Sequence, residues 1–180
     1  SELEDARRVV KRVADRIKRL IEENERVTKE VKEASEKLLK DTKDATRRLA
    51  KEVKELVKRL RGKDVEELKR RLEEIKRSSD KVEEDNRRES ERLRKTSEEY
   101  VDELRKELER LEREVKEIEE RNNIDEKDKK RLEEELERLR ESSERYDERL
   151  KRELERLEEE HRRYIRRLKE ELDKLREDTD

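Results

Sequence analysis

The chain has 180 residues, of which 63% are charged and only 26% hydrophobic, and its 56 basic residues nearly balance its 58 acidic ones. So little apolar material cannot fill the core of a compact domain of this size, but it can fill the thin seam of a long helical bundle. Disulfide and thiol chemistry are excluded because there is no Cys, and the net charge of −2 argues against nucleic acid as a partner.

The first predicted element is a helix over about residues 2–61, a stretch without Pro or Gly. It ends at Gly62, because glycine adopts the left-handed conformation of a helix C-cap at little cost. Asp64 then has the position and chemistry of an N-cap, and Glu67 completes the spacing of a capping box. A short turn at Gly62 is therefore predicted.

The second predicted helix covers about residues 64–121 and ends at Asn122 and Asn123. Asparagine is the next-best residue after glycine for a left-handed cap. Asp125 is a good N-cap for a third helix, with Asp128 three residues further on.

The third predicted helix covers about residues 125–178. Helices joined by such short turns must fold back on one another. We therefore expect an all-α fold, a single up-down-up antiparallel three-helix bundle over residues 1–180. The first helix has an excess of basic residues and the other two have an excess of acidic ones, so ion pairs along their flanks are also expected.

Apolar residues recur in alternating steps of four and three, and this pattern repeats every 18 residues in all three helices. Equivalent positions are Val13, Val31 and Leu49; Leu72, Ser90 and Leu108; and Leu136, Leu154 and Leu172. Eighteen residues make five turns at 3.6 residues per turn. A seven-residue repeat would impose a left-handed supercoil and an eleven-residue repeat a right-handed one. The pattern therefore predicts long, nearly straight helices.

With its Leu-rich seams, its Glu, Lys and Arg surface and its lack of Pro, Met, Cys and Phe, the chain resembles de novo designed helical bundles generated from parametric equations. The resemblance covers essentially the whole chain. It implies a bundle without a natural biochemical role.

Several seam positions are polar, and they gather at two levels of the expected bundle. Antiparallel alignment about the two turns groups the residues of a first network: Asn24, Thr28, Ser97, Tyr100, Ser143 and Tyr146. It groups those of a second network: Thr42, Thr46, Ser79, Asn86, His161 and Tyr164. The same alignment places Ser35 level with Ser90.

A buried polar group without a partner costs about 1–3 kcal/mol, and clustering across three helices lets each group find one. Such networks also fix helix register, because a shifted alignment would bury the same groups unpaired. We therefore predict two cross-helix hydrogen-bond networks.

His161 and Tyr164 could instead suggest acid–base chemistry or a metal site. A metal needs three or four convergent ligands, and a lone His without Cys does not supply them. No catalytic, cofactor-binding or metal-binding residue is expected, although His161 could lend modest sensitivity to pH.

The first helix is apolar over a wider arc than the others, which leaves two interpretations open. An extra row of apolar residues runs along one flank of this helix and consists of Leu3, Ile21, Leu39 and Val57. The row could pack within the bundle, or it could dock a partner helix or a second copy of the chain.

The sequence therefore predicts a structural scaffold without enzymatic activity. It is expected to need no cofactor and no partner, and to bind neither nucleic acid nor a membrane. The alternative is a subunit of a designed homo- or hetero-oligomer. As an artificial chain it is expected to be soluble, and cytoplasmic on recombinant expression. No run of apolar residues approaches the roughly 18 that a membrane span requires.

Overall fold

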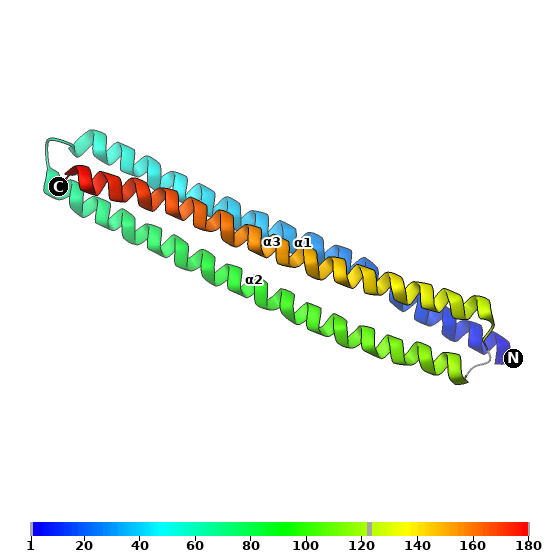
Figure 1. Cartoon of the computed structure of the whole chain (residues 1–180). Helices are drawn as coiled ribbons and strands as arrows, with labels where there is room; N and C mark the ends of the chain where they lie inside the picture. Colours follow the sequence, from blue (N-terminus) through cyan, green and yellow to red (C-terminus); the bar gives the residue numbers. More distant parts are fainter. Residues whose placement is uncertain (1, 122–123, 180) are drawn as a thin grey trace. The chain divides into compact units, whose positions relative to one another are not determined.

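The protein is all-α, and three long helices account for nearly all of the residues, 2–121 and 124–179, that a computed structural model describes. The helices are α1 (Glu2–Leu60), α2 (Val65–Arg121) and α3 (Glu126–Thr179) (Figure 1). The sequence-based bounds differ from these by at most one residue at each end, so the predicted helices are confirmed.

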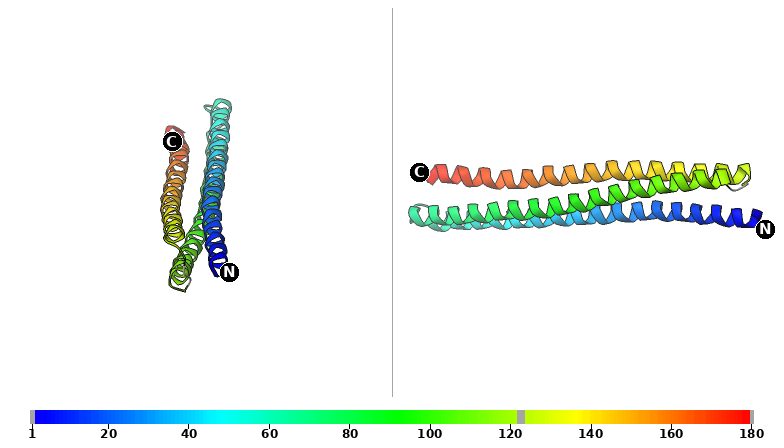
Figure 2. Two further views of the ribbon diagram at one scale, coloured as in Figure 1. Left: turned by 90° about the vertical axis from the view of Figure 1, so that its right-hand side faces the viewer. Right: turned by 90° about the horizontal axis from the view of Figure 1, so that it is seen from below.

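The turn between α1 and α2 has the predicted chemistry. Gly62 has a φ of 78°, and the carbonyl oxygen of Leu60 accepts the backbone N–H groups of Lys63 and Asp64 at 3.1 and 3.0 Å. The carboxylate of Asp64 accepts the N–H of Glu67 at 3.0 Å and so caps the N-terminus of α2. The chain reverses direction at this turn, at the cyan-to-green end of the ribbon in Figure 2.

The start of α3 is capped in the same way, since the carboxylate of Asp125 accepts the N–H of Asp128 at 2.9 Å. The predicted left-handed cap at Asn122 and Asn123 lies outside the described residues.

The contacts of the chain gather into two compact units, and each unit contains a part of all three helices. Unit 1 consists of Ser1–Lys32 and Lys95–Arg152, and unit 2 consists of Glu33–Arg94 and Glu153–Asp180. That the two form a single straight bundle over residues 1–180 stays a prediction.

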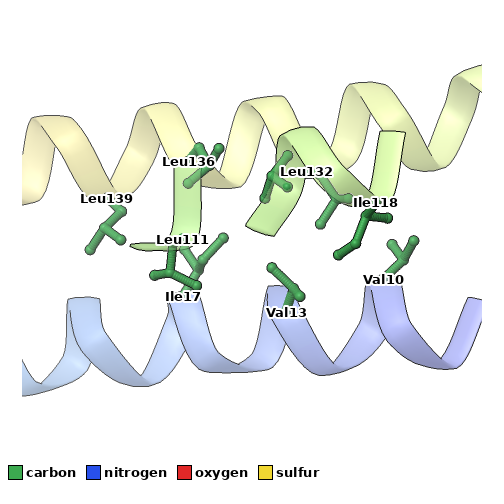
Figure 3. Close-up of a cluster of buried hydrophobic side chains, with 9 residues drawn as sticks. Val10, Val13, Ile17, Leu111, Ile118, Leu132, Leu136 and Leu139 are labelled. Atoms are coloured by element: carbon green, nitrogen blue, oxygen red, sulfur yellow. The ribbon is translucent and has the colours of Figure 1, made fainter. Parts of the chain in front are cut away.

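The core of unit 1 is a layer of apolar side chains from all three helices. Its buried members are Val10, Val13 and Ile17 from α1, Leu111, Val115 and Ile118 from α2, and Leu132, Leu136 and Leu139 from α3. Figure 3 shows Val10 beside Ile118 and Ile17 beside Leu111, so α1 and α2 run antiparallel in this unit. In the same view α3 advances in the direction of α1, which gives the up-down-up order.

The core of unit 2 follows the same seams. Its buried members are Val53 and Leu56 from α1, Leu68, Leu72 and Ile75 from α2, and Leu168 and Leu172 from α3. Burial of one such side chain stabilises the fold by about 1.5–3 kcal/mol, so these layers dominate the folding energy.

Cross-helix ion pairs depart from the expectation based on the charge of each helix. Basic α1 contributes Arg16, whose guanidinium contacts Glu107 and Glu114 of α2 at 2.8 Å each. Several pairs instead join the two acidic helices, including Arg140 with Glu112 in unit 1. Local placement along the flanks therefore decides the pairing, and the total charge of a helix does not.

Candidate functional site

The candidate site consists of the buried polar side chains, because specific hydrogen bonds inside an apolar core require polar groups. Those with little or no exposure are Asn24, Ser35, Thr42, Thr46, Ser79, Asn86, Ser90, Ser97, Glu135 and His161. Most of the predicted network residues are among them. Thr28, Tyr100, Ser143 and Tyr164 are half-buried, and Tyr146 is buried.

In unit 1, Asn24 of α1 links all three helices. Its side-chain oxygen accepts the hydroxyl of Tyr100 from α2 at 2.8 Å, and its side-chain nitrogen donates to the hydroxyl of Ser142 from α3 at 3.1 Å. Tyr146 packs its ring edge-to-face on Tyr100, with centroids 5.0 Å apart.

The other residues predicted for the first network bond locally or not at all. Thr28 donates to the carbonyl of Asn24 at 2.7 Å, and Ser143 donates to the carbonyl of Leu139 at 2.8 Å, each one turn back on its own helix. Ser97 and the hydroxyl of Tyr146 are buried without a hydrogen-bond partner. The structure therefore places Ser142, which sequence reasoning missed, where Ser143 was expected.

Burial controls the acidity of both tyrosines. Loss of solvent raises the pKa of Tyr100 to about 12, and the nearby carboxylate of Glu23 adds to this shift. Burial raises the pKa of Tyr146 as well, with smaller contributions from Tyr100 and Asp147. Both hydroxyls are therefore neutral over the physiological range and can donate hydrogen bonds.

In unit 2, Asn86 of α2 is the centre of a second cluster. Its side-chain nitrogen donates to the hydroxyl of Thr42 on α1, and its side-chain oxygen accepts the hydroxyl of Ser90 at 3.0 Å. The same nitrogen lies 3.5 Å from the carbonyl oxygen of Leu38. Thr46 donates to the carbonyl of Lys43 on its own helix. These bonds connect α1 and α2.

The structure does not join His161 of α3 or Ser79 of α2 to this cluster by a hydrogen bond. Both ring nitrogens of His161 and the hydroxyl of Ser79 are buried without a hydrogen-bond partner. The alignment assumed in the prediction put His161 level with Asn86. In the structure His161 lies beside the backbone of Glu83, which is less than one helical turn from Asn86, so a shift of register does not explain the missing hydrogen bonds.

His161 lies in surroundings that disfavour its charged form. Burial lowers the pKa of His161 below its ordinary value of 6.5. The carboxylate and backbone of Glu83 favour the charged form and offset part of this effect, while Arg162 opposes it. The imidazole is therefore neutral at pH 7, with one nitrogen that donates and one that accepts.

Comparison with family models, curated proteins and solved structures finds no match to this chain.

The flank of α1 that could dock a partner is largely covered by the chain itself. Leu39 is buried, and Ile21 and Val57 are half-buried against the apolar cores of units 1 and 2, respectively. Leu3 is 49% exposed. The only other large apolar side chain with comparable exposure among the described residues is Val65.

Over residues 2–121 and 124–179, no three or more His, Cys, Asp or Glu side chains lie close enough together to bind a metal ion. None of the described helices combines the length and the apolar character that crossing a membrane requires.

Two buried residues of α3 were not predicted from the sequence. Ile165 is buried, and it is the only Ile in α3, so its apolar character was a signal that the spacing rule passed over in favour of Tyr164. Glu135 is also buried and pairs with Arg138 at 3.3 Å. In a helix this rich in Glu, nothing in the sequence distinguishes that residue.

Proposed function

We propose that the chain is a de novo designed structural scaffold, a helical bundle without natural biochemical activity that holds three helices in a fixed register. The observation that carries this proposal is the position of Asn24, which bonds to α2 on one side and to α3 on the other. A one-residue slip of any helix would leave the oxygen or the nitrogen of this buried amide unpaired, at a cost of about 1–3 kcal/mol.

The regularity of the sequence supports the design origin. All three helices repeat their seam positions every 18 residues, and the chain lacks Pro, Cys, Met, Trp and Phe. The caps at Gly62, Asp64 and Asp125 lie where the sequence pattern ends one helix and begins the next. Such agreement among pattern, caps and core is what a designed sequence aims for.

The scaffold proposal is tested by the oligomeric state and by the stability of the register. Size-exclusion chromatography with light scattering is expected to give a monomer of 22.4 kDa. Asn24→Leu is expected to broaden the amide NMR spectrum or add a second set of signals, because the register is no longer enforced. A multiple of that mass, or an Asn24→Leu spectrum as sharp and simple as that of the parent chain, would contradict the proposal.

A subunit of a designed oligomer that docks through the flank of α1 is the second candidate, and the exposed side chain of Leu3 favours it. Leu3→Glu would then reduce the measured mass to that of a monomer. Leu39 is unsuitable for this test, because a charge at that buried position would also destabilise a monomer.

An enzymatic role is not proposed. Turnover of any substrate that disappears in His161→Ala would contradict this, since His161 is the only His and its ring nitrogens make no hydrogen bond.

A further inference from the structure

A small groove between α1 and α3 in unit 1 combines three arginines with a serine hydroxyl. Its volume is about 130 Å³. Sites for drug-sized molecules begin at roughly 300 Å³, so this space suits a single small ion better than an extended molecule. Which ion it suits follows from the charge of the lining and from the hydrogen-bond donors that the lining offers.

The lining has an excess of positive charge. Its three arginines, Arg138, Arg145 and Arg149, come from α3. Together with Ser142 they follow one another in steps of four, three and four residues, which is the spacing of one helix face. Among the described residues that line the groove, Glu25 is the only acidic one, so an anion is attracted. A larger groove between α2 and α3 in unit 2 is lined by equal numbers of basic and acidic residues and attracts neither sign.

Two of the three guanidinium groups have no competing carboxylate. Arg138 pairs with Glu135 of the same helix at 3.3 Å. Arg145 donates its Nε–H to the carbonyl of Glu141 at 3.4 Å, but in the described part of the chain neither Arg145 nor Arg149 pairs with a carboxylate. Their terminal N–H groups are therefore available to an anion. A planar guanidinium matches two oxygens of a phosphoryl group at once.

Ser142 adds a neutral donor that is positioned from within the core. Its oxygen accepts a side-chain N–H of Asn24 at 3.1 Å, and the oxygen of Asn24 in turn accepts the hydroxyl of Tyr100. Asn24 is only 2% exposed, whereas Ser142 is half-buried and lines the groove. The hydroxyl hydrogen of Ser142 has no acceptor among the described residues. An anion that accepts it extends this chain of hydrogen bonds, and each bond strengthens the next.

We infer that this groove binds a phosphate dianion, either as the free ion or as the terminal group of a phosphomonoester. Arg145 and Arg149 bind its oxygens from the solvent side, and the hydroxyl of Ser142 donates to it from the side of the core. Two like charges four residues apart on a helix repel each other, and an anion between them relieves this repulsion.

Methyl phosphate is a suitable probe, because at about pH 7.5 it is mainly a dianion. At low ionic strength its titration is expected to shift the side-chain amide signal of Asn24 and the backbone amide signal of Ser142 saturably, with half-saturation on the order of 1 mM. Inorganic phosphate should bind as well, and the tighter of the two identifies the ester or the free ion as the better ligand. Methyl sulfate has the same shape with one charge less and should bind at least threefold more weakly. Equal binding of methyl sulfate would overturn the assignment of a dianion.

Substitutions at exposed positions locate the site. Arg149→Gln removes one positive charge and should weaken binding of methyl phosphate at least threefold, whereas Glu25→Gln removes the opposing carboxylate and should strengthen it about twofold. Arg152→Gln is the matched control, because Arg152 is an exposed arginine of α3 in the same unit that does not line the groove. It should bind methyl phosphate as the parent chain does.

Ser142→Ala removes the neutral donor and should also weaken binding at least threefold. It leaves the nitrogen of Asn24 without its partner, so circular dichroism must first establish that the variant is folded. If it is not, Arg149→Gln and Glu25→Gln decide the matter. The inference is wrong if methyl phosphate gives no saturable shift at ten times the expected half-saturation. It is equally wrong if Arg149→Gln weakens binding no more than Arg152→Gln, or if folded Ser142→Ala binds as tightly as the parent chain.

Discussion

The rings of Tyr100 and Tyr146 pack against each other, but the hydrogen bonding of their hydroxyl groups differs. The hydroxyl of Tyr100 donates to Asn24, whereas the hydroxyl of Tyr146 is buried without a partner. A buried hydroxyl is stabilising only when it is bonded, so the same chemical change should have opposite effects at the two positions.

Tyr100→Phe is expected to lower the free energy of unfolding by about 1–2 kcal/mol, because it removes one hydrogen bond and leaves the oxygen of Asn24 unpaired. Urea denaturation followed by circular dichroism measures this loss. In Asn24→Ala the same Tyr100→Phe change should cost much less, and an undiminished cost would show that the bond is not its cause.

Tyr146→Phe is expected to be neutral, or to raise the free energy of unfolding by up to about 1 kcal/mol, since an unpaired hydroxyl leaves a buried site. The ring contact with Tyr100 is preserved in this variant. The same urea titration applies, and a loss above about 1 kcal/mol would reveal a partner for this hydroxyl.

His161 should make stability depend on pH in a predictable direction. Its pKa is lowered in the folded chain, so below pH 6.5 the unfolded chain binds more protons. The contribution of His161 to the free energy of unfolding is then fully present above pH 6.5 and falls as the pH drops below 6.5, by at most about 1.4 kcal/mol per pH unit. Urea titrations at several pH values measure the fall.

His161→Leu is the control for this titration, because it removes the group and should flatten that part of the pH profile. Glu83 partly offsets the effect of burial and Arg162 reinforces it, so the fall should be smaller than the upper limit. An identical slope in the variant and the parent chain would assign the pH dependence to other groups.

Among the elements, the helices and their caps were predictable because both depend on residues close together in the sequence. Gly62, Asp64 and Asp125 act on backbone groups within three or four residues of themselves. Side-chain partners were less predictable. Ser142 and Ser143 are adjacent and chemically identical, and only the rotation of α3 within unit 1 decides which one faces Asn24.

The partners of His161 were the other weak point. Counting outward from an expected turn put His161 beside Asn86, and in the structure it lies beside the backbone of Glu83, less than one turn from Asn86. Its ring nitrogens nevertheless bond to no side chain of the cluster around Asn86. Apolar periodicity predicts the level of a seam residue but not the direction of its ring, so the missing bonds could not be predicted from the sequence.

Gly62→Ala is expected to lower the free energy of unfolding by about 1 kcal/mol, because alanine adopts a φ of 78° with strain. A Cβ at this position would meet no atom within 4 Å, so the cost comes from the backbone alone. Thermal denaturation measures it, and Gly62→Asn should recover part of the loss, since asparagine tolerates this conformation better. An unchanged melting temperature for Gly62→Ala would argue against the turn.

On the scale of the whole molecule, the sequence predicted an all-α chain of three packed helices because period, composition and turns all favoured it. It did not predict that the contacts would gather into two units. Each unit draws on two stretches of chain that are far apart in sequence, and the 18-residue repeat of each helix continues from one unit into the other.

The ring pair Tyr100–Tyr146 lies in unit 1, and His161 lies in unit 2. A fixed aromatic pair in an asymmetric setting gives a near-ultraviolet dichroic signal, and a solitary imidazole gives its own magnetic resonance line. The chain thus contains one natural reporter for each unit, and no label needs to be attached. Heating a single sample and comparing the two curves would show whether the halves melt together or in succession.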